Sequence, residues 1–182
     1  GEIGPELRLS VDANRPRAAR PAAALIGATT AKAVDEVLEQ PAGVFDESIQ
    51  GAPYQHMKLI HYPGREAGGS GQGVGAHKDP GYLTLVMQDD HSGLEVETAS
   101  GWISAPPLPG ALVVNIGELL ELASNGYLKA TLHRVQSPPP GVSRLSCAFF
   151  MAARLDATVP LLTLSPQWET LVDWLAGEGM AE

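Results

Sequence analysis

Apolar residues in this chain gather in short runs that are separated by turns rich in Gly, Pro and Asp. Short runs bounded by turn residues predict β-strands. Strands are predicted at residues 54–62, 74–88 with a break near Pro80-Gly81, 94–98, 102–105, 111–116, 128–136, 144–154 and 159–164. About eight short strands at this spacing are typical of an antiparallel sandwich or jelly roll. The chain is therefore expected to be mainly β, with a few short flanking helices.

Helical patterns are few and short in this chain. Apolar residues share one face of residues 31–40, directly after Thr29-Thr30, which can cap a helix. Residues 118–123 predict a brief helical turn, and the last residues repeat a helix-like apolar pattern. The expected organisation is an N-terminal arm with a short helix (1–53), a β core (54–164) and a C-terminal helical tail (165–182).

The composition and charge of the chain limit the classes of protein to which it can belong. The 182 residues are 44% hydrophobic and 18% charged, values typical of one folded domain. The net charge of −9 repels phosphate backbones, so we expect no nucleic-acid partner. No apolar run approaches the ~20 residues that span a bilayer, so we expect no membrane partner, and the N-terminus lacks the apolar segment of a signal peptide. Cys147 is the only cysteine, which favours a reducing cytoplasm.

Three residues could bind a metal. Residues two apart on a strand point to the same face, so His77 and Asp79 can direct an imidazole and a carboxylate to one point. His133, in the strand-like ATLHRVQ, can supply a third ligand. Two histidines and one carboxylate leave adjacent metal positions open, as in non-haem Fe(II) oxygenases. A single His-x-Asp is common by chance, and a single histidine is more often structural, so the prediction depends on the combination.

Arg144 and Ser146 could bind an anion. On a strand the two side chains share a face, and a guanidinium beside a hydroxyl suits a carboxylate. The apolar residues that follow, LSCAFFMAA, indicate that Arg144 needs an anion if it is buried. The alternative is an edge-strand arginine in a surface ion pair.

The stretch 58–162 resembles the isopenicillin N synthase-like family of Fe(II)/2-oxoglutarate dioxygenases. The resembling segments are KLIHYP, GVGAHKDPGYLTLVMQDDHSGLEVE, GWISAPPLPGALVVNIGELLELASNG and YLKATLHRVQSPPPGVSRLSCAFFM. The resemblance implies a double-stranded β-helix (jelly roll) in which a metal lies inside the barrel. Relatives carry a longer segment before KLIHYP, where this chain has 57 residues. Many also carry an asparagine where this chain has Ile60.

The resemblance also assigns roles to the candidate residues. It implies that His77, Asp79 and His133 bind Fe(II). It implies that Arg144 and Ser146, assisted by Tyr62, hold the distal carboxylate of 2-oxoglutarate, and that Phe150 faces the substrate, although core packing is an equal interpretation. The expected reaction uses O₂ to oxidise a small molecule by hydroxylation, desaturation or ring closure, and releases succinate and CO₂.

Other functions remain open on the sequence. Isopenicillin N synthase uses the same Arg-x-Ser pair for the carboxylate of its substrate, so an oxidase without 2-oxoglutarate is one alternative. A non-catalytic jelly-roll binding module is a second, and a zinc hydrolase is a more distant third. The sequence does not determine the substrate or the oligomeric state.

Overall fold

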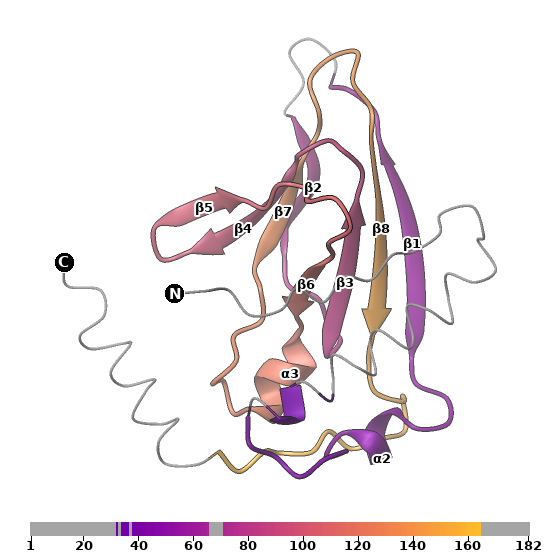
Figure 1. The fold of residues 1–182 in the computed structure, drawn as a ribbon, viewed down its shortest axis with the longest axis vertical. Coiled ribbons are helices and arrows are strands. Elements are labelled where there is room, and N and C mark those ends of the chain that lie inside the picture. The colour runs from indigo at the N-terminus through magenta and orange to yellow at the C-terminus, as the bar shows by residue number, and fades with distance from the viewer. Residues whose placement is uncertain (1–31, 33, 37, 66–70, 165–182) are drawn as a thin grey trace.

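Two four-stranded antiparallel sheets make up the fold in the computed structural model, which describes residues 32, 34–36, 38–65 and 71–164 (Figure 1). The strands are β1 Gln55–Tyr62, β2 Gln72–His77, β3 Leu83–Gln88, β4 Leu94–Thr98, β5 Gly101–Ser104, β6 Val113–Ile116, β7 His133–Gln136 and β8 Arg144–Met151. One sheet has the order β1-β8-β3-β6, and the other has the order β2-β7-β4-β5. Two short helices, α2 (Asp46–Ile49) and α3 (Glu118–Ala123), lie together at one end of the strands. The fold is therefore the predicted double-stranded β-helix.

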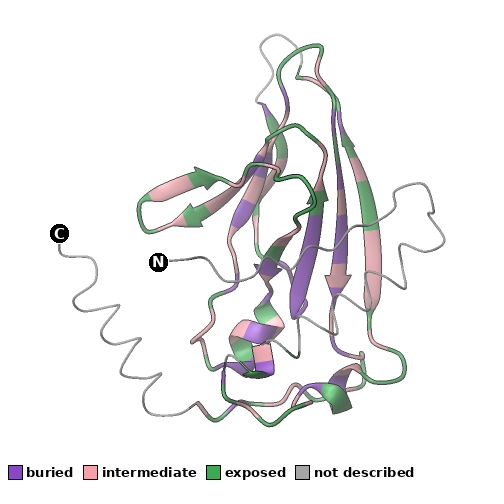
Figure 2. Ribbon diagram, viewed as in Figure 1, coloured by how far each residue is buried: buried purple, intermediate pink, exposed green. Residues whose placement is uncertain are grey.

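Burial follows the alternation of side chains along the strands. In β8, Arg144, Ser146 and Ala148 are buried, whereas the side chain of Leu145 between the first two is exposed. Strand β3 is buried on both faces over its first four residues, because it lies between β8 and β6 within its sheet and α3 covers one end (Figure 2). A second, smaller apolar cluster joins the two sheets around Leu94 and Val135. One face of β8 therefore points into the space between the sheets.

Several predicted boundaries were wrong. No strand forms at residues 159–164; instead the Leu162 N–H donates to the Ala123 carbonyl at 2.8 Å, and the segment packs beside α3. Residues 128–132 are not part of β7, because the Ser124 hydroxyl accepts from the Leu128 N–H and shapes a turn after α3. The predicted strand 74–88 is divided into β2 and β3, as the Pro80-Gly81 break indicates.

The predicted helices differ in outcome. α3 forms at 118–123 as predicted. The helix predicted at 31–40 ends earlier, because residues 38–39 form a turn in which Glu39 has φ +53°. The N-terminal arm before residue 32, the Thr29-Thr30 cap and the tail 165–182 lie outside the described residues. In the part of the chain that the structure describes, no helix is both long and apolar enough to cross a membrane.

The turn after β2 lies against the connection between β6 and α3. The Gly117 N–H donates to the Tyr82 carbonyl and the Glu118 N–H donates to the Asp79 carbonyl, both at 2.8 Å. A Cβ at Gly117 would lie 2.0 Å from the Gly81 carbonyl oxygen and 3.0 Å from that of Asp79. Only glycine therefore allows the two segments to approach so closely, and this approach fixes the backbone of Asp79.

We predict that Gly117→Ala destabilises the fold by about 1–3 kcal/mol, because the new methyl group forces backbone atoms apart. Urea unfolding of the two proteins measures the difference. Gly75→Ala is the matched control, since its Cβ would meet only the flexible Gln72 amide, at 3.2 Å. Equal stability of the Gly117→Ala variant and the wild-type chain would contradict the proposed role of this contact.

Candidate metal centre and anion site

Asp79 and two histidines meet between the sheets. His77 ends β2 and lies directly opposite His133, which begins β7. Their rings are 4.3 Å apart between centroids. The Asp79 carboxylate lies 3.6 Å from His77 Nε2 and 3.7 Å from His133 Nε2, and one ligand atom from each residue falls within 4.8 Å of the others. The structure thus brings together the three predicted residues, although Asp79 lies in the turn after β2 and not on the strand itself.

Both imidazoles are held by backbone carbonyl groups. His77 Nδ1 lies 2.9 Å from the Gly75 carbonyl oxygen, and His133 Nδ1 lies 2.8 Å from that of Thr131. A carbonyl only accepts, so each Nδ1 carries the proton and donates it, which leaves each Nε2 lone pair free toward Asp79. Such a second hydrogen bond is typical of metal-binding histidines, because it fixes the ring and its tautomer.

The burial of Asp79 indicates a cation. The residue is 2% exposed, and its Oδ2 has no hydrogen-bond donor among the described residues. An ionised carboxylate is costly to bury without a compensating charge. Two imidazole nitrogens and one carboxylate oxygen form a donor set that suits Fe(II) and leaves metal positions open. The residues present therefore fit a bound divalent metal.

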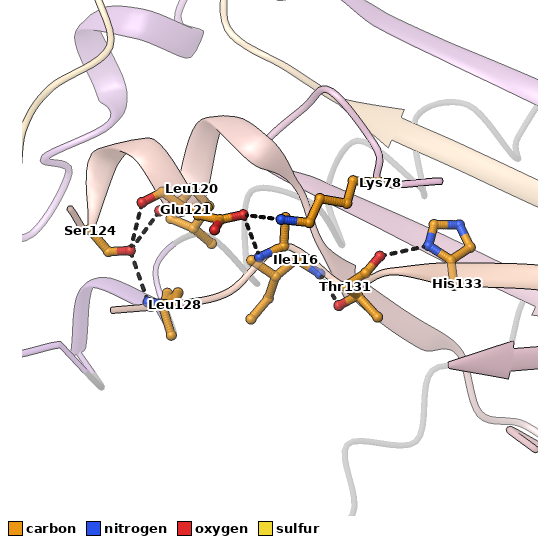
Figure 3. Close-up of polar contacts among 9 residues, drawn as sticks. Lys78, Ile116, Leu120, Glu121, Ser124, Leu128, Thr131 and His133 are labelled. Carbon is orange, nitrogen blue, oxygen red and sulfur yellow. Dashed lines mark hydrogen bonds and ion pairs between the residues drawn. The ribbon is translucent and has the colours of Figure 1, made fainter. Parts of the chain in front are cut away.

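Helix α3 ties the two ligand-bearing segments together (Figure 3). Lys78, between His77 and Asp79 in the sequence, donates to Glu121 Oε2 at 2.9 Å, and the same oxygen accepts from the Ala130 N–H at 3.0 Å. The Lys78 ammonium and then the Ala130 N–H lower the pKa of Glu121 below its ordinary value of 4.5. One carboxylate therefore links the Asp79 turn to the segment that leads into His133.

Arg144 is a buried cation whose donors are only partly satisfied by the described residues. It is 1% exposed; its Nε donates to the His91 carbonyl at 3.1 Å and its Nη2 donates to Gln88 Oε1 at 2.8 Å. Its Nη1 has no partner in the described part of the chain. The guanidinium also lies 4.9 Å from the centre of the Tyr62 ring. Since a buried guanidinium needs its donors satisfied, Nη1 indicates a site for an anion.

The turn before β4 is shaped to hold Arg144. Burial by itself would raise the pKa of the Asp89 carboxyl. The hydrogen bonds that the carboxylate accepts from the backbone N–H groups of Leu145 and His91 outweigh this effect, so the pKa of Asp89 is lowered. This turn presents the His91 carbonyl to the guanidinium. Sequence patterns carry no signal for Gln88 or for this carbonyl, because both act only through residues far away in the chain.

One cavity of about 140 Å³ joins the metal candidates to the anion candidates. It is lined by the metal candidates His77, Asp79 and His133, and by Arg144, Ser146, Tyr62 and Phe150. Phe150 is also stacked on His56, with centroids 4.4 Å apart, so this ring both lines the cavity and packs against β1. Every predicted site residue therefore borders the same space.

Comparison with known proteins identifies the family. The profile of the 2OG-Fe(II) oxygenase superfamily matches residues 53–153. This chain belongs to that superfamily. A homoarginine-6-hydroxylase of Arabidopsis thaliana is 45% identical over 130 residues, which are 68% of this chain and 39% of the relative. The 2-oxoglutarate-dependent dioxygenase citB of Monascus ruber is 38% identical over 138 residues, 69% of this chain and 40% of the relative.

Solved structures agree with the fold. A full-length Neurospora crassa protein in complex with alpha-KG has a TM-score of 0.72 and 26% identity, over 86% of this chain and 59% of that chain. JOX2 in complex with 2OG, Fe and JA has a TM-score of 0.72 and 27% identity, over 79% of this chain and 43% of that chain. The chain spans about two fifths of the length of the curated relatives given above.

We predict that His133→Ala weakens Fe(II) binding by at least ~100-fold, since the loss of a ligand should exceed the 10–100-fold effect of losing a ligand's supporting partner. Anaerobic calorimetric titration of the metal-free chain with ferrous iron measures the affinity. His61→Ala, an exposed histidine on β1, is the control and should bind iron like the wild-type chain. Near-normal iron binding by His133→Ala would rule out the ligand assignment.

We predict that the Lys78–Glu121 pair stabilises the fold in a pH-dependent way. Because the pKa of Glu121 is lowered on folding, its contribution is complete above pH 4.5 and is lost as pH falls through the lowered value. Glu121→Gln should therefore cost about 0.5 kcal/mol at pH 7 and progressively less in acid. Unfolding curves at several pH values test this, with the exposed Glu118→Gln as control. A difference that does not change with pH would exclude the charge pair as its source.

Proposed function

We propose that this chain carries the catalytic centre of an Fe(II)- and 2-oxoglutarate-dependent dioxygenase that oxidises a small organic molecule. The observation that carries the proposal is one cavity lined both by the His77–Asp79–His133 cluster and by Arg144, whose Nη1 has no partner among the described residues. The proposal includes O₂ as co-substrate and excludes nucleic acid and membrane as partners. We also propose a cytoplasmic location, on the grounds of the single free Cys147.

In this proposal His77, Asp79 and His133 hold the metal. The carbonyls of Gly75 and Thr131 hold both imidazole rings in orientation, with Nε2 directed toward the metal position. When bound, Fe(II) would supply the O₂ chemistry that converts 2-oxoglutarate to succinate and CO₂ and oxidises the substrate by hydroxylation, desaturation or ring closure. His133 and Asp79 are almost fully buried, whereas the His77 side chain is 40% exposed. The protein thus excludes water from two sides of the centre and leaves the His77 side open for entry.

Arg144 and Ser146 bind the distal carboxylate of 2-oxoglutarate in this proposal. Both residues are buried, share one face of β8 and border the cavity. Gln88 and the His91 carbonyl hold two donors of the guanidinium, which leaves Nη1 for the anion. Tyr62 packs against the guanidinium through its ring, and so helps fix its position.

The relatives give the first substrates to assay. The 45%-identical relative is a homoarginine-6-hydroxylase, and the Neurospora crassa structural neighbour has also been solved in complex with thymine. We propose homoarginine and thymine as starting compounds.

The test is an anaerobic titration of the full chain with Fe(II) and then with 2-oxoglutarate. Chelation of the metal by the 2-oxo acid should give a weak absorption band in the green, and admission of O₂ should release succinate. Release of product without succinate would favour the oxidase that needs no 2-oxoglutarate. Absence of the band in a folded sample would favour a binding module without this activity.

We predict that Arg144→Gln raises the 2-oxoglutarate concentration for half-saturation by about 30-fold or more, because truncating one partner of a buried charge pair costs at least ~2 kcal/mol. Iron binding should stay unchanged. Arg154→Gln is the control, since Arg154 pairs with the exposed Asp156 on the surface. An unaltered requirement in Arg144→Gln would mean that the arginine serves another anion.

A further inference from the structure

A single row of residues crosses the cavity wall of the β1-β8-β3-β6 sheet. Asn115 on β6 lies opposite Thr84 on β3, Thr84 lies opposite Phe150 on β8, and Phe150 lies opposite His56 on β1. Residues directly opposite each other in antiparallel strands share a face of the sheet. Because Thr84 and Phe150 line the cavity, Asn115 and His56 lie on the cavity face as well.

The polar atoms of this row are buried and find no hydrogen-bond partner in the part of the chain that the structure describes. Thr84 and Asn115 are each 1% exposed, and neither Thr84 Oγ1 nor either amide atom of Asn115 has a hydrogen-bond partner among the described residues. His56 Nδ1 is likewise buried and unpaired within the described ranges. Each unmade buried hydrogen bond costs about 1–3 kcal/mol. Such a concentration of unmet donors and acceptors in one cavity wall indicates a ligand.

The row lies at the metal end of the cavity, far from the anion site. Arg144 begins β8, and Phe150 lies about 20 Å further along that strand at its ordinary rise. The Tyr82 N–H donates to the Met151 carbonyl, which places the turn after Asp79 at the same end of β8 as Phe150. A five-carbon dicarboxylate held by Arg144 is too short to reach this row. Its ligand must be a different molecule.

The charges of the residues in the row limit which ligands could bind there. None of the four residues in the row carries a formal charge when His56 is neutral, and a charged group would be costly to bury against them. Asn115 offers both a donor and an acceptor, and Thr84 can act as either. The Phe150 ring supplies a flat apolar surface beside them. Lys58, whose Nζ lies 5.0 Å from the Phe150 ring centre, also lines the cavity, but it is exposed and lies opposite Ala148, outside the row.

We propose that Thr84 and Asn115 form a primary-substrate subsite for a neutral planar group that both donates and accepts hydrogen bonds, such as a carboxamide, ureido or lactam group, packed beside Phe150. The inference rests on the proposed function, since it assigns this end of the cavity to the molecule that is oxidised. It adds two specificity residues, Thr84 and Asn115, to the candidates.

The experiment uses two probes of nearly equal shape. Benzamide carries a carboxamide on a flat ring, and acetophenone replaces the amide NH₂ by a methyl group, so it accepts hydrogen bonds but cannot donate them. Ligand-observed NMR titration of each probe onto the full chain, loaded anaerobically with Fe(II) and 2-oxoglutarate, gives the two affinities. We expect benzamide to bind about tenfold more tightly, the effect of about 1.4 kcal/mol from the additional hydrogen bonds.

Variants locate the preference in the row. Thr84→Val and Asn115→Leu keep shape but remove the polar atoms, and each should reduce the preference for benzamide by about 3–10-fold. Thr84→Ser keeps the hydroxyl and should preserve the preference. Thr163→Val, at an exposed position, is the control. Because apolar isosteres remove unmet polar groups, Thr84→Val and Asn115→Leu should unfold at or above the wild-type temperature.

The outcomes separate the subsite from the proposed function. Equal affinity of the wild-type chain for both probes, or an unaltered preference in Thr84→Val and Asn115→Leu, would overturn the subsite and leave the row with a structural role. The 2-oxoglutarate affinity is measured in the same samples. If the wild-type chain does not bind 2-oxoglutarate, the result counts against the proposed dioxygenase. If it binds 2-oxoglutarate normally but shows no preference for benzamide over acetophenone, the result counts against the subsite alone.

Discussion

The buried carboxylate of Asp79 is the constraint on which the rest of the site depends. A carboxylate that is 2% exposed, with one oxygen that lacks a donor among the described residues, is unstable unless a positive charge lies beside it. The two imidazoles that face it are oriented through their Nδ1 atoms and so present lone pairs. The three groups do not satisfy one another, but together they satisfy a divalent cation. The free energy of metal binding therefore offsets the cost of burying Asp79.

The surrounding fold holds the three residues in that arrangement. His77 and His133 face each other across β2 and β7, which fixes their separation through the sheet. Asp79 is held by a different means, the contact of its turn with Gly117 and Glu118. Glu121 then joins this turn to the segment before His133. Shifts of α3 would therefore alter both sides of the metal centre at once.

The cavity has two chemically different ends. At one end a guanidinium whose Nη1 has no partner among the described residues indicates an anion. At the other end a row of polar groups that are likewise unpaired within those residues indicates an uncharged ligand. The metal candidates lie toward the second end. This division suits a reaction with two organic molecules, because each molecule meets groups that the other does not satisfy. If either molecule occupied the other molecule's end of the cavity, a buried charge or several buried polar atoms would be left unpaired.

The sequence by itself determined the strand-rich fold and the candidates His77, Asp79, His133, Arg144 and Ser146, because alternation and turn residues act locally and His-x-Asp and Arg-x-Ser are short patterns. It also indicated the helix at 118–123. Only the tertiary structure decided that Asp79 lies in a turn and that residues 159–164 pack beside α3 without forming a strand. It also decided that Gln88 holds Arg144, and that Thr84 lines the cavity with Asn115 opposite it on β6. These features depend on backbone approach and strand register between distant segments, which no local pattern encodes.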